Sequence, residues 1–109
     1  MDAESGSSPM LMTVLEGHVT SEQWAAFADH VRTASTRLPP QMVQTLLVQS
    51  TADPTLWRML SIWRSQEALG EYRRAVDVPE GVLMFRAVGA EPQLSIFTVS
   101  ANQRAGDGG

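Results

Sequence analysis

The sequence has no cysteine, which excludes disulfide bonds, a thiol nucleophile and a thiolate metal site. Only 18% of its residues are charged, against about 25% in average soluble domains, and its eight basic residues are all arginines dispersed along the chain. Binding to nucleic acid or to an anionic membrane requires clustered positive charge. No apolar run reaches the roughly 18 residues of a membrane span, and the start does not resemble a signal peptide. We therefore expect a cytoplasmic protein with neither of those partners.

The chain has 109 residues, enough for one small domain. Residues 1–9 and 102–109 are small and polar, and offer too little apolar surface to offset the entropy lost on ordering. We therefore expect flexible tails at 1–9 and 102–109 around one domain at 10–101. A domain of this size has a thin core, and association with a partner is a common remedy.

Four segments rich in apolar and β-branched residues predict strands, at 10–19, 43–50, 56–63 and 94–100. An Asp-Pro turn between the second and third predicts a hairpin. Apolar residues at helical spacing predict helices over 20–37 and 65–74, and a short third helix over 82–88. Two capping boxes, Thr20 with Gln23 and Asp77 with Glu80, are expected to begin the first and third helices, and Ser65 is expected to be the N-cap of the second. Pro39 is expected to end the first helix, and Gly89 the third.

This order of elements, strand–helix–strand–strand–helix–strand, is the βαββαβ pattern of ferredoxin-like α+β domains. It predicts an antiparallel four-stranded sheet with its helices on one face. Such a sheet normally alternates between apolar and polar residues. Here the strands at 10–19 and 56–63 are apolar on both faces, so something must cover the second face. We expect a homodimer to do so, because two-fold dimers dominate soluble oligomers; the alternative is a C-terminal segment that folds back over the sheet.

The segment from Trp63 to Tyr72 resembles the antibiotic biosynthesis monooxygenase superfamily of dimeric α+β barrels, and the resemblance extends over roughly residues 10–100. In that family, the third strand ends in a tryptophan and is followed by a Ser or Asp, an acid, an Ala and an apolar residue. Trp63, Ser65, Glu67, Ala68 and Leu69 match this pattern. Tyr72 stands where the family often has histidine, and Ser61 where it commonly has an acid.

The resemblance implies a pocket between sheet and helices in each protomer, and cofactor-free oxygenation of a phenol, quinol or anthrone-like substrate. We therefore expect a monooxygenase that acts on a small hydrophobic aromatic substrate and requires neither a cofactor nor a metal. The alternative is a non-catalytic dimeric module that binds a small ligand or assists another enzyme, and the absent histidine and acid favour it. A haem-binding branch of the family uses a strand Asn and a later His. The sequence disfavours that function, because no histidine follows residue 30.

Oxygenation without a cofactor requires the substrate anion to be held in a dry apolar slot beside a few polar groups. The expected slot residues are Trp24, Phe27, Trp57, Met59, Met84 and Phe85, although residues of these types also serve simply as core.

Four polar residues are candidates for contact with the substrate anion. The Tyr72 hydroxyl suits hydrogen-bond donation to a substrate oxygen, and Trp63 can donate its indole N–H to the same oxygen. His18 is the alternative base, placed near the pocket mouth, and Arg86 a possible partner for the anion. Each has a simpler interpretation: a partly buried tyrosine, a packing tryptophan, a solvated histidine, and an arginine paired with Glu80 or Glu91. Finally, Arg58 is expected to form a buried ion pair with Glu16.

Overall fold

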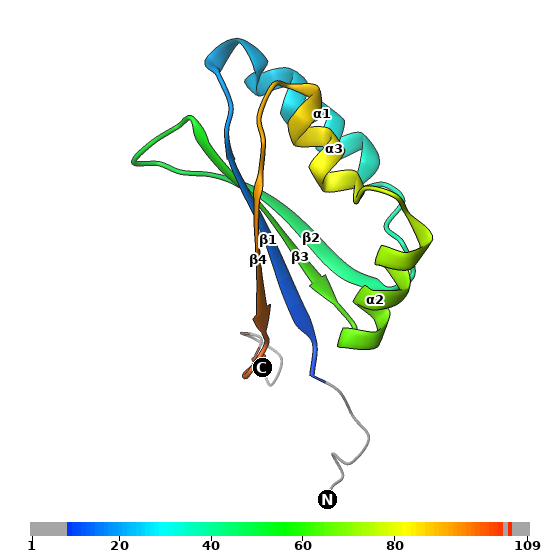
Figure 1. Cartoon of the computed structure of the whole chain (residues 1–109). Helices are drawn as coiled ribbons and strands as arrows, with labels where there is room; N and C mark the ends of the chain where they lie inside the picture. The colour runs from blue at the N-terminus through cyan, green and yellow to red at the C-terminus, as the bar shows by residue number, and fades with distance from the viewer. Residues whose placement is uncertain (1–8, 104, 106–109) are drawn as a thin grey trace, which may run out of the picture.

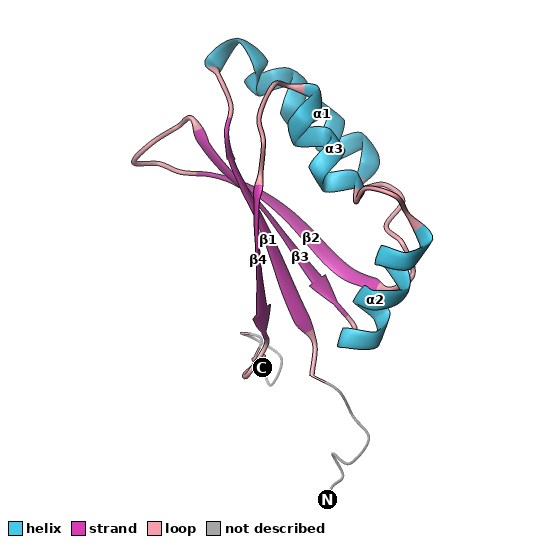
Figure 2. Ribbon diagram, viewed as in Figure 1, coloured by secondary structure: helices cyan, strands magenta, loops and turns pink. Residues whose placement is uncertain are grey.

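The strands form one antiparallel sheet in the order β2-β3-β1-β4, and the helices lie against one of its faces (Figures 1 and 2). The computed structural model describes residues 9–103 and 105, so most of both expected tails lies outside it. Its elements are β1 (Leu11–His18), the 3-10 helix η1 (Ser21–Gln23), α1 (Trp24–Ala34), β2 (Met42–Gln49), β3 (Leu56–Trp63), α2 (Gln66–Ala75), α3 (Glu80–Ala87) and β4 (Gln93–Thr98). This is the ferredoxin-like α+β fold that the sequence predicts, with element ends moved by a few residues.

The N-terminal signals of the helices are confirmed at one site and wrong at two. The Ser65 hydroxyl accepts a hydrogen bond from the Ala68 backbone N–H at 3.0 Å, as expected for an N-cap. The Thr20 side chain makes no capping bond; its carbonyl instead accepts from the Gln23 N–H at 2.9 Å and closes η1. At the start of α3 the N-cap residue is Pro79, and not the expected Asp77.

Helix α3 ends as its glycine predicts. Gly89 has φ +82°, a conformation that glycine adopts without the steric cost of a Cβ. The Gly89 N–H donates to the Arg86 carbonyl at 3.0 Å, and the Ala90 N–H donates to the Phe85 carbonyl at 3.0 Å. These two bonds form a Schellman motif, which satisfies carbonyls at the end of the helix. The motif turns the chain back toward the sheet and into β4.

The core has two separate parts on the helix side of the sheet. The larger joins β1 and β3 to α1 and α3, and contains Leu15, Val19, Phe27, Val31, Trp57, Met59, Phe85, Val88 and Ala90. The smaller joins the same strands to α2, and contains Leu11, Trp63 and Leu69 with the partly buried Met42 and Tyr72 against them. Helix α2 therefore contacts the sheet apart from the other two helices, as Figure 1 shows.

The other face of the sheet carries no helix. Its side chains include Leu46 and Val48 of β2 and Phe97 of β4, which are 46%, 39% and 50% exposed. The expected pair between Arg58 and Glu16 is present at 2.7 Å on this face. In the single chain nothing described covers the pair, and the two side chains are 50% and 38% exposed. Burial of the pair therefore requires a second copy over this face and stays a prediction. We name this surface the open face.

Candidate active site

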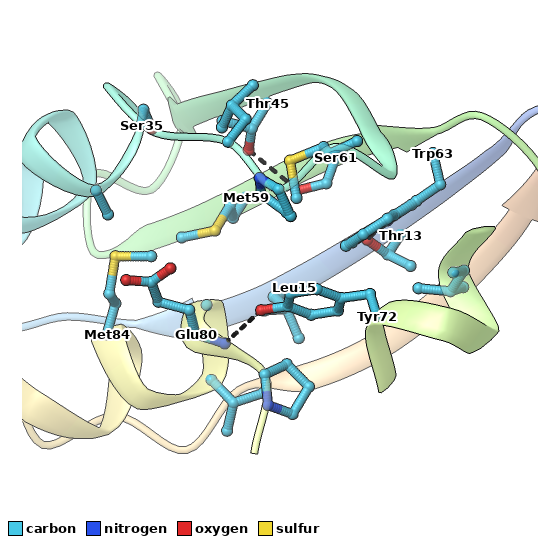
Figure 3. A pocket seen from close by; sticks show the side chains of 18 of the residues that line it. Thr13, Leu15, Ser35, Thr45, Met59, Ser61, Trp63, Tyr72, Glu80 and Met84 are labelled. Carbon is cyan, nitrogen blue, oxygen red and sulfur yellow. Dashed lines mark hydrogen bonds between the residues drawn. The ribbon is translucent and has the colours of Figure 1, made fainter. Parts of the chain in front are cut away.

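A cavity of about 90 Å³ lies on the helix side of the sheet, between the two parts of the core (Figure 3). One buried water needs roughly 10–15 Å³ on this measure, so the space has room for several waters. Its wall is mostly apolar and comes from both core regions and from the loops around α1 and α2. The residues that line it are Thr13, Leu15, Ala34, Ser35, Arg37, Leu38, Pro39, Met42, Thr45, Met59, Ser61, Trp63, Leu69, Tyr72, Arg73, Pro79, Glu80, Gly81, Val82, Met84 and Leu94.

Four of the candidates from the sequence line this cavity, namely Met59, Trp63, Tyr72 and Met84. The other four slot residues do not, and their expected placement was wrong. They are Trp24, Phe27, Trp57 and Phe85, and their rings pack on one another, with centroids 4.7–6.4 Å apart in neighbouring pairs. These rings fill the space beneath α1 and α3, so the cavity lies further along the sheet, toward α2.

Trp63 gives its indole proton to another residue of the wall. Its Nε1 donates to the Thr13 hydroxyl at 2.9 Å, across β3 and β1, where both side chains are buried. An indole has one N–H, so the expected donation from Trp63 to a substrate oxygen does not fit this arrangement. The Thr13 hydroxyl accepts that bond and keeps its own proton. Thr13 therefore replaces Trp63 as the possible donor to the cavity.

Tyr72 lies with its ring against Trp63, with centroids 4.9 Å apart and planes inclined by 43°. Its phenol oxygen accepts a hydrogen bond from the Glu80 backbone N–H at 3.1 Å. This bond satisfies one of the unpaired N–H groups that begin α3, a role that the sequence had assigned to Asp77. A phenol that accepts one bond still has its proton to donate. Figure 3 shows the Tyr72 oxygen between α2 and the start of α3.

A second pair of hydroxyls lies in the wall on the side of β2. Thr45 and Ser61 face each other across β2 and β3, and their oxygens are 3.0 Å apart. Either hydroxyl can donate to the other, so one proton of the pair is left for a ligand. Ser61 is at the position where the family commonly has an acid. A neutral hydroxyl pair therefore occupies the place of that charge.

His18 does not line the cavity, and its expected position near the mouth was wrong. It ends β1 beside the β2–β3 hairpin, where its Nδ1 is 3.0 Å from the Thr55 hydroxyl. The Thr55 hydroxyl donates its proton to Asp53 at 2.7 Å, so the bond to His18 needs the proton on Nδ1. These bonds hold His18 to the hairpin turn. The Thr55 hydrogen bonds also lower the pKa of Asp53, and the charge of His18 adds to this effect.

Arg86 also lies outside the cavity wall. It forms the alternative pair that the sequence allowed: its guanidinium makes two hydrogen bonds to the Glu91 carboxylate, both 2.9 Å long. These bonds raise the pKa of Arg86 and lower the pKa of Glu91. Two of its N–H groups are thus engaged by Glu91, in the α3–β4 connection.

Sequence reasoning missed several polar residues of the wall: Thr13, Thr45, Arg37, Arg73 and Glu80. The two-residue period of β1 places Thr13 on the same face as Leu11 and Leu15, which was a usable signal. Arg37 and Arg73 lie in a loop and on a helix, and no periodic pattern relates them. Within the described part of the chain, no three His, Asp or Glu side chains gather as a metal site would need.

The fold and the cavity define a small α+β domain with a ligand-sized space beneath its helices. The sequence profile described as antibiotic biosynthesis monooxygenase matches residues 10–80, and the chain belongs to this family.

Solved structures share this fold. A variant of SnoaB, a cofactor-independent oxygenase from Streptomyces nogalater, is 20% identical, with 87% of this chain and 97% of that chain covered and a TM-score of 0.64. A protein from Nitrosomonas europaea is 15% identical, with coverage of 90% and 97% and a TM-score of 0.66. A conserved protein from Methanosarcina mazei is 16% identical, with coverage of 83% and 92% and a TM-score of 0.64. None of the curated proteins matches the sequence.

None of the helices in the described residues is long and apolar enough to cross a membrane. The cellular location expected from the sequence stays a prediction.

Proposed function

We propose that this protein is a cofactor-independent monooxygenase that oxidises a small hydrophobic aromatic substrate, a phenol, quinol or anthrone-like compound, with O₂ in the cavity described above. The proposal rests mainly on the environment of the Tyr72 hydroxyl. It accepts from the Glu80 N–H, lies in an apolar wall, and has a proton to donate to a ligand. The family supports an oxygenase in general, and the cavity supports the aromatic substrate.

The reaction needs no electrons beyond those of the substrate. An anthrone-like anion transfers electrons to O₂, one oxygen atom replaces the two hydrogens of the ring CH₂ as a carbonyl, and the other leaves as water. The protein contributes by stabilising the anion, because hydrogen-bond donors in a dry site favour a developing oxyanion. We assign that role to the Tyr72 and Thr13 hydroxyls, whose protons are not used by the described residues. Met59 and Met84 supply apolar contacts to the ring.

The proposal includes a homodimer formed through the open face. Large apolar side chains are exposed there on the two edge strands β2 and β4, and exposed apolar surface of this kind is typical of an interface. Strand β4 is exposed on its helix side too, where Leu94 and Ile96 are 45% and 46% exposed. Because Leu94 also lines the cavity, a second copy seated around β4 would close that part of the wall. The dimeric α+β barrel expected from the sequence is therefore part of this proposal.

The test is oxygen consumption with a panel of anthrone-like and quinol substrates. The native protein is expected to consume one O₂ per substrate, and ¹⁸O₂ to place one labelled oxygen in the quinone product. Tyr72→Phe keeps the ring contact with Trp63 but removes the donor. Loss of one such donor typically costs about 10²–10³ in rate. Arg32→Gln, on the exposed side of α1, is the matched control and should leave the rate unchanged.

Three outcomes decide the proposal. Turnover that falls in Tyr72→Phe but not in Arg32→Gln supports it. Turnover unchanged in Tyr72→Phe contradicts the assigned role of the phenol. Tight binding of an aromatic ligand by native protein without any O₂ uptake contradicts the oxygenase, and leaves the non-catalytic binding module as the function.

A further inference from the structure

We propose that Arg37 and Arg73 form an anion-binding subsite at the mouth of the cavity, and that the natural substrate carries a carboxylate besides its aromatic ring. The inference rests on the proposed function, because it names the class of molecule that the same cavity takes. It adds a contact that the ring itself does not explain.

The first observation is how the arginines are engaged. Within the described residues, Arg32, Arg58 and Arg86 form ion pairs with acids, and Arg64 donates to the Pro40 carbonyl at 2.9 Å. The other described arginines have no hydrogen bond or ion pair through their guanidinium groups; these are Arg37, Arg73 and Arg74.

The second observation is the position of these arginines. Arg37 and Arg73 both line the cavity, whereas Arg74 does not. Arg37 lies in the segment between α1 and β2, and Arg73 lies in the last turn of α2. Two elements far apart in the sequence thus bring two unpaired cations to one cavity. Five donors on each guanidinium are left for a ligand.

The third observation is the charge of the wall. Among the lining residues, Glu80 is the only acid beside the two arginines, so their formal charges sum to +1. Figure 3 shows the Glu80 carboxylate directed toward Met84, away from the Tyr72 hydroxyl. The nearby Glu71 is engaged elsewhere, since it accepts from the Gln41 amide at 3.4 Å. The cavity mouth therefore favours an anion.

A guanidinium binds a carboxylate through two parallel N–H···O bonds, and the planar fork matches the carboxylate better than it matches a neutral ester. The apolar wall suits a ring, and the two arginines in the wall suit a charged group attached to that ring. A ring with a carboxylate satisfies both requirements. Because both arginines are exposed, water and salt compete with the ligand, and the contribution of each is modest.

The experiment measures binding of two probes to the whole chain by calorimetry: 9,10-anthraquinone-2-carboxylate and its neutral methyl ester. Both contain the ring, and neither can be oxidised further in the proposed way. Native protein should bind the carboxylate on the order of tenfold more tightly than the ester, and the difference should shrink as salt is raised. Arg37→Gln and Arg73→Gln should each weaken carboxylate binding by about three- to tenfold and leave ester binding unchanged.

Arg74→Gln is the matched control, because Arg74 is adjacent in α2, equally unpaired and outside the wall. It should change neither affinity by more than about twofold. Circular dichroism checks that each variant is folded, and the unchanged ester affinity checks the cavity itself.

Equal binding of both probes, unaffected by Arg37→Gln and Arg73→Gln, would overturn the anion subsite and leave the proposed oxygenase intact. An equal loss in Arg74→Gln would also overturn it, because the effect would then come from general surface charge. If native protein binds neither probe, the aromatic cavity of the proposed function fails together with the subsite.

Discussion

Glu16 and Arg58 stand directly opposite each other in the central strands β1 and β3, and their side chains form a 2.7 Å ion pair on the uncovered face of the sheet. In a lone chain a half-exposed pair of this kind contributes at most about 1 kcal/mol. If a second copy covers the face, the same pair becomes desolvated, and loss of one partner then leaves an uncompensated charge in the interface.

We therefore predict that Glu16→Gln weakens self-association by more than about tenfold, since an unpaired interfacial charge costs about 2–5 kcal/mol. Sedimentation equilibrium of native and variant protein measures this. Asp29→Asn, which removes the exposed Asp29–Arg32 pair on α1, should leave the association constant unchanged. Native protein that stays monomeric at micromolar concentration would contradict both the dimer and this prediction.

The buried bond from Trp63 to Thr13 gives a stability prediction. Thr13→Val keeps the shape of the side chain but leaves the Trp63 N–H without an acceptor, which costs about 1–3 kcal/mol. Thr13→Ser retains the hydroxyl and should recover most of that loss. Urea unfolding followed by tryptophan fluorescence measures both variants. A Thr13→Val protein as stable as the native chain would show that the bond contributes nothing.

The sequence predicted the sheet better than it predicted the site. Strands were placed to within one or two residues, because β-branched segments bounded by Thr, Pro and Gly have few other conformations. The capping boxes at Thr20 and Asp77 were wrong because spacing supplies a possible hydrogen bond but not the backbone geometry that makes it. The bond from Glu80 to Tyr72 joins α3 to a different helix, and no local pattern predicts it.

The same limit explains the cavity. Period-two spacing correctly puts Trp57, Met59 and Trp63 on one face of β3, but it does not say which of them has a helix above it. Trp57 lies under α1, and Trp63 lies near α2. The cavity exists because the core divides between those helices. Only the packing of the three helices fixes where that division falls.

Close packing at Gly17 gives a further prediction. A Cβ at this position would meet the Phe85 ring at 2.9 Å, and the Phe85 side chain is fully buried in the core. Gly17→Ala should therefore destabilise the protein by about 1–3 kcal/mol. Gly70→Ala is the comparison: its Cβ would meet only the end of the Arg74 side chain at 3.3 Å, and alanine favours a helix by about 0.5–1 kcal/mol. Thermal unfolding of the two variants should therefore shift in opposite directions.

The hairpin turn between β2 and β3 gives a dependence of stability on pH. The Thr55 hydroxyl and backbone N–H donate to the Asp53 carboxylate at 2.7 and 3.2 Å, and this lowers the pKa of Asp53 from its ordinary value of 3.8.

The folded protein therefore binds the Asp53 proton less well than the unfolded chain does. The stabilisation that these hydrogen bonds give is fully present at pH values above 3.8, the ordinary pKa of the group. It is lost as the pH falls through the lowered pKa of the folded state. Asp53→Asn lacks this titration, so the stability advantage of the native protein should shrink as the pH falls below 3.8, the ordinary pKa of the group, and through the lowered pKa of the folded state. Thr55→Val should remove most of the same dependence, because the Thr55 hydroxyl is the main cause of the lowered pKa. Urea unfolding at a series of pH values measures the free energy of unfolding of each variant. If the difference in this free energy between native and Asp53→Asn protein stays constant with pH, the hydrogen bonds do not act on the charge of Asp53.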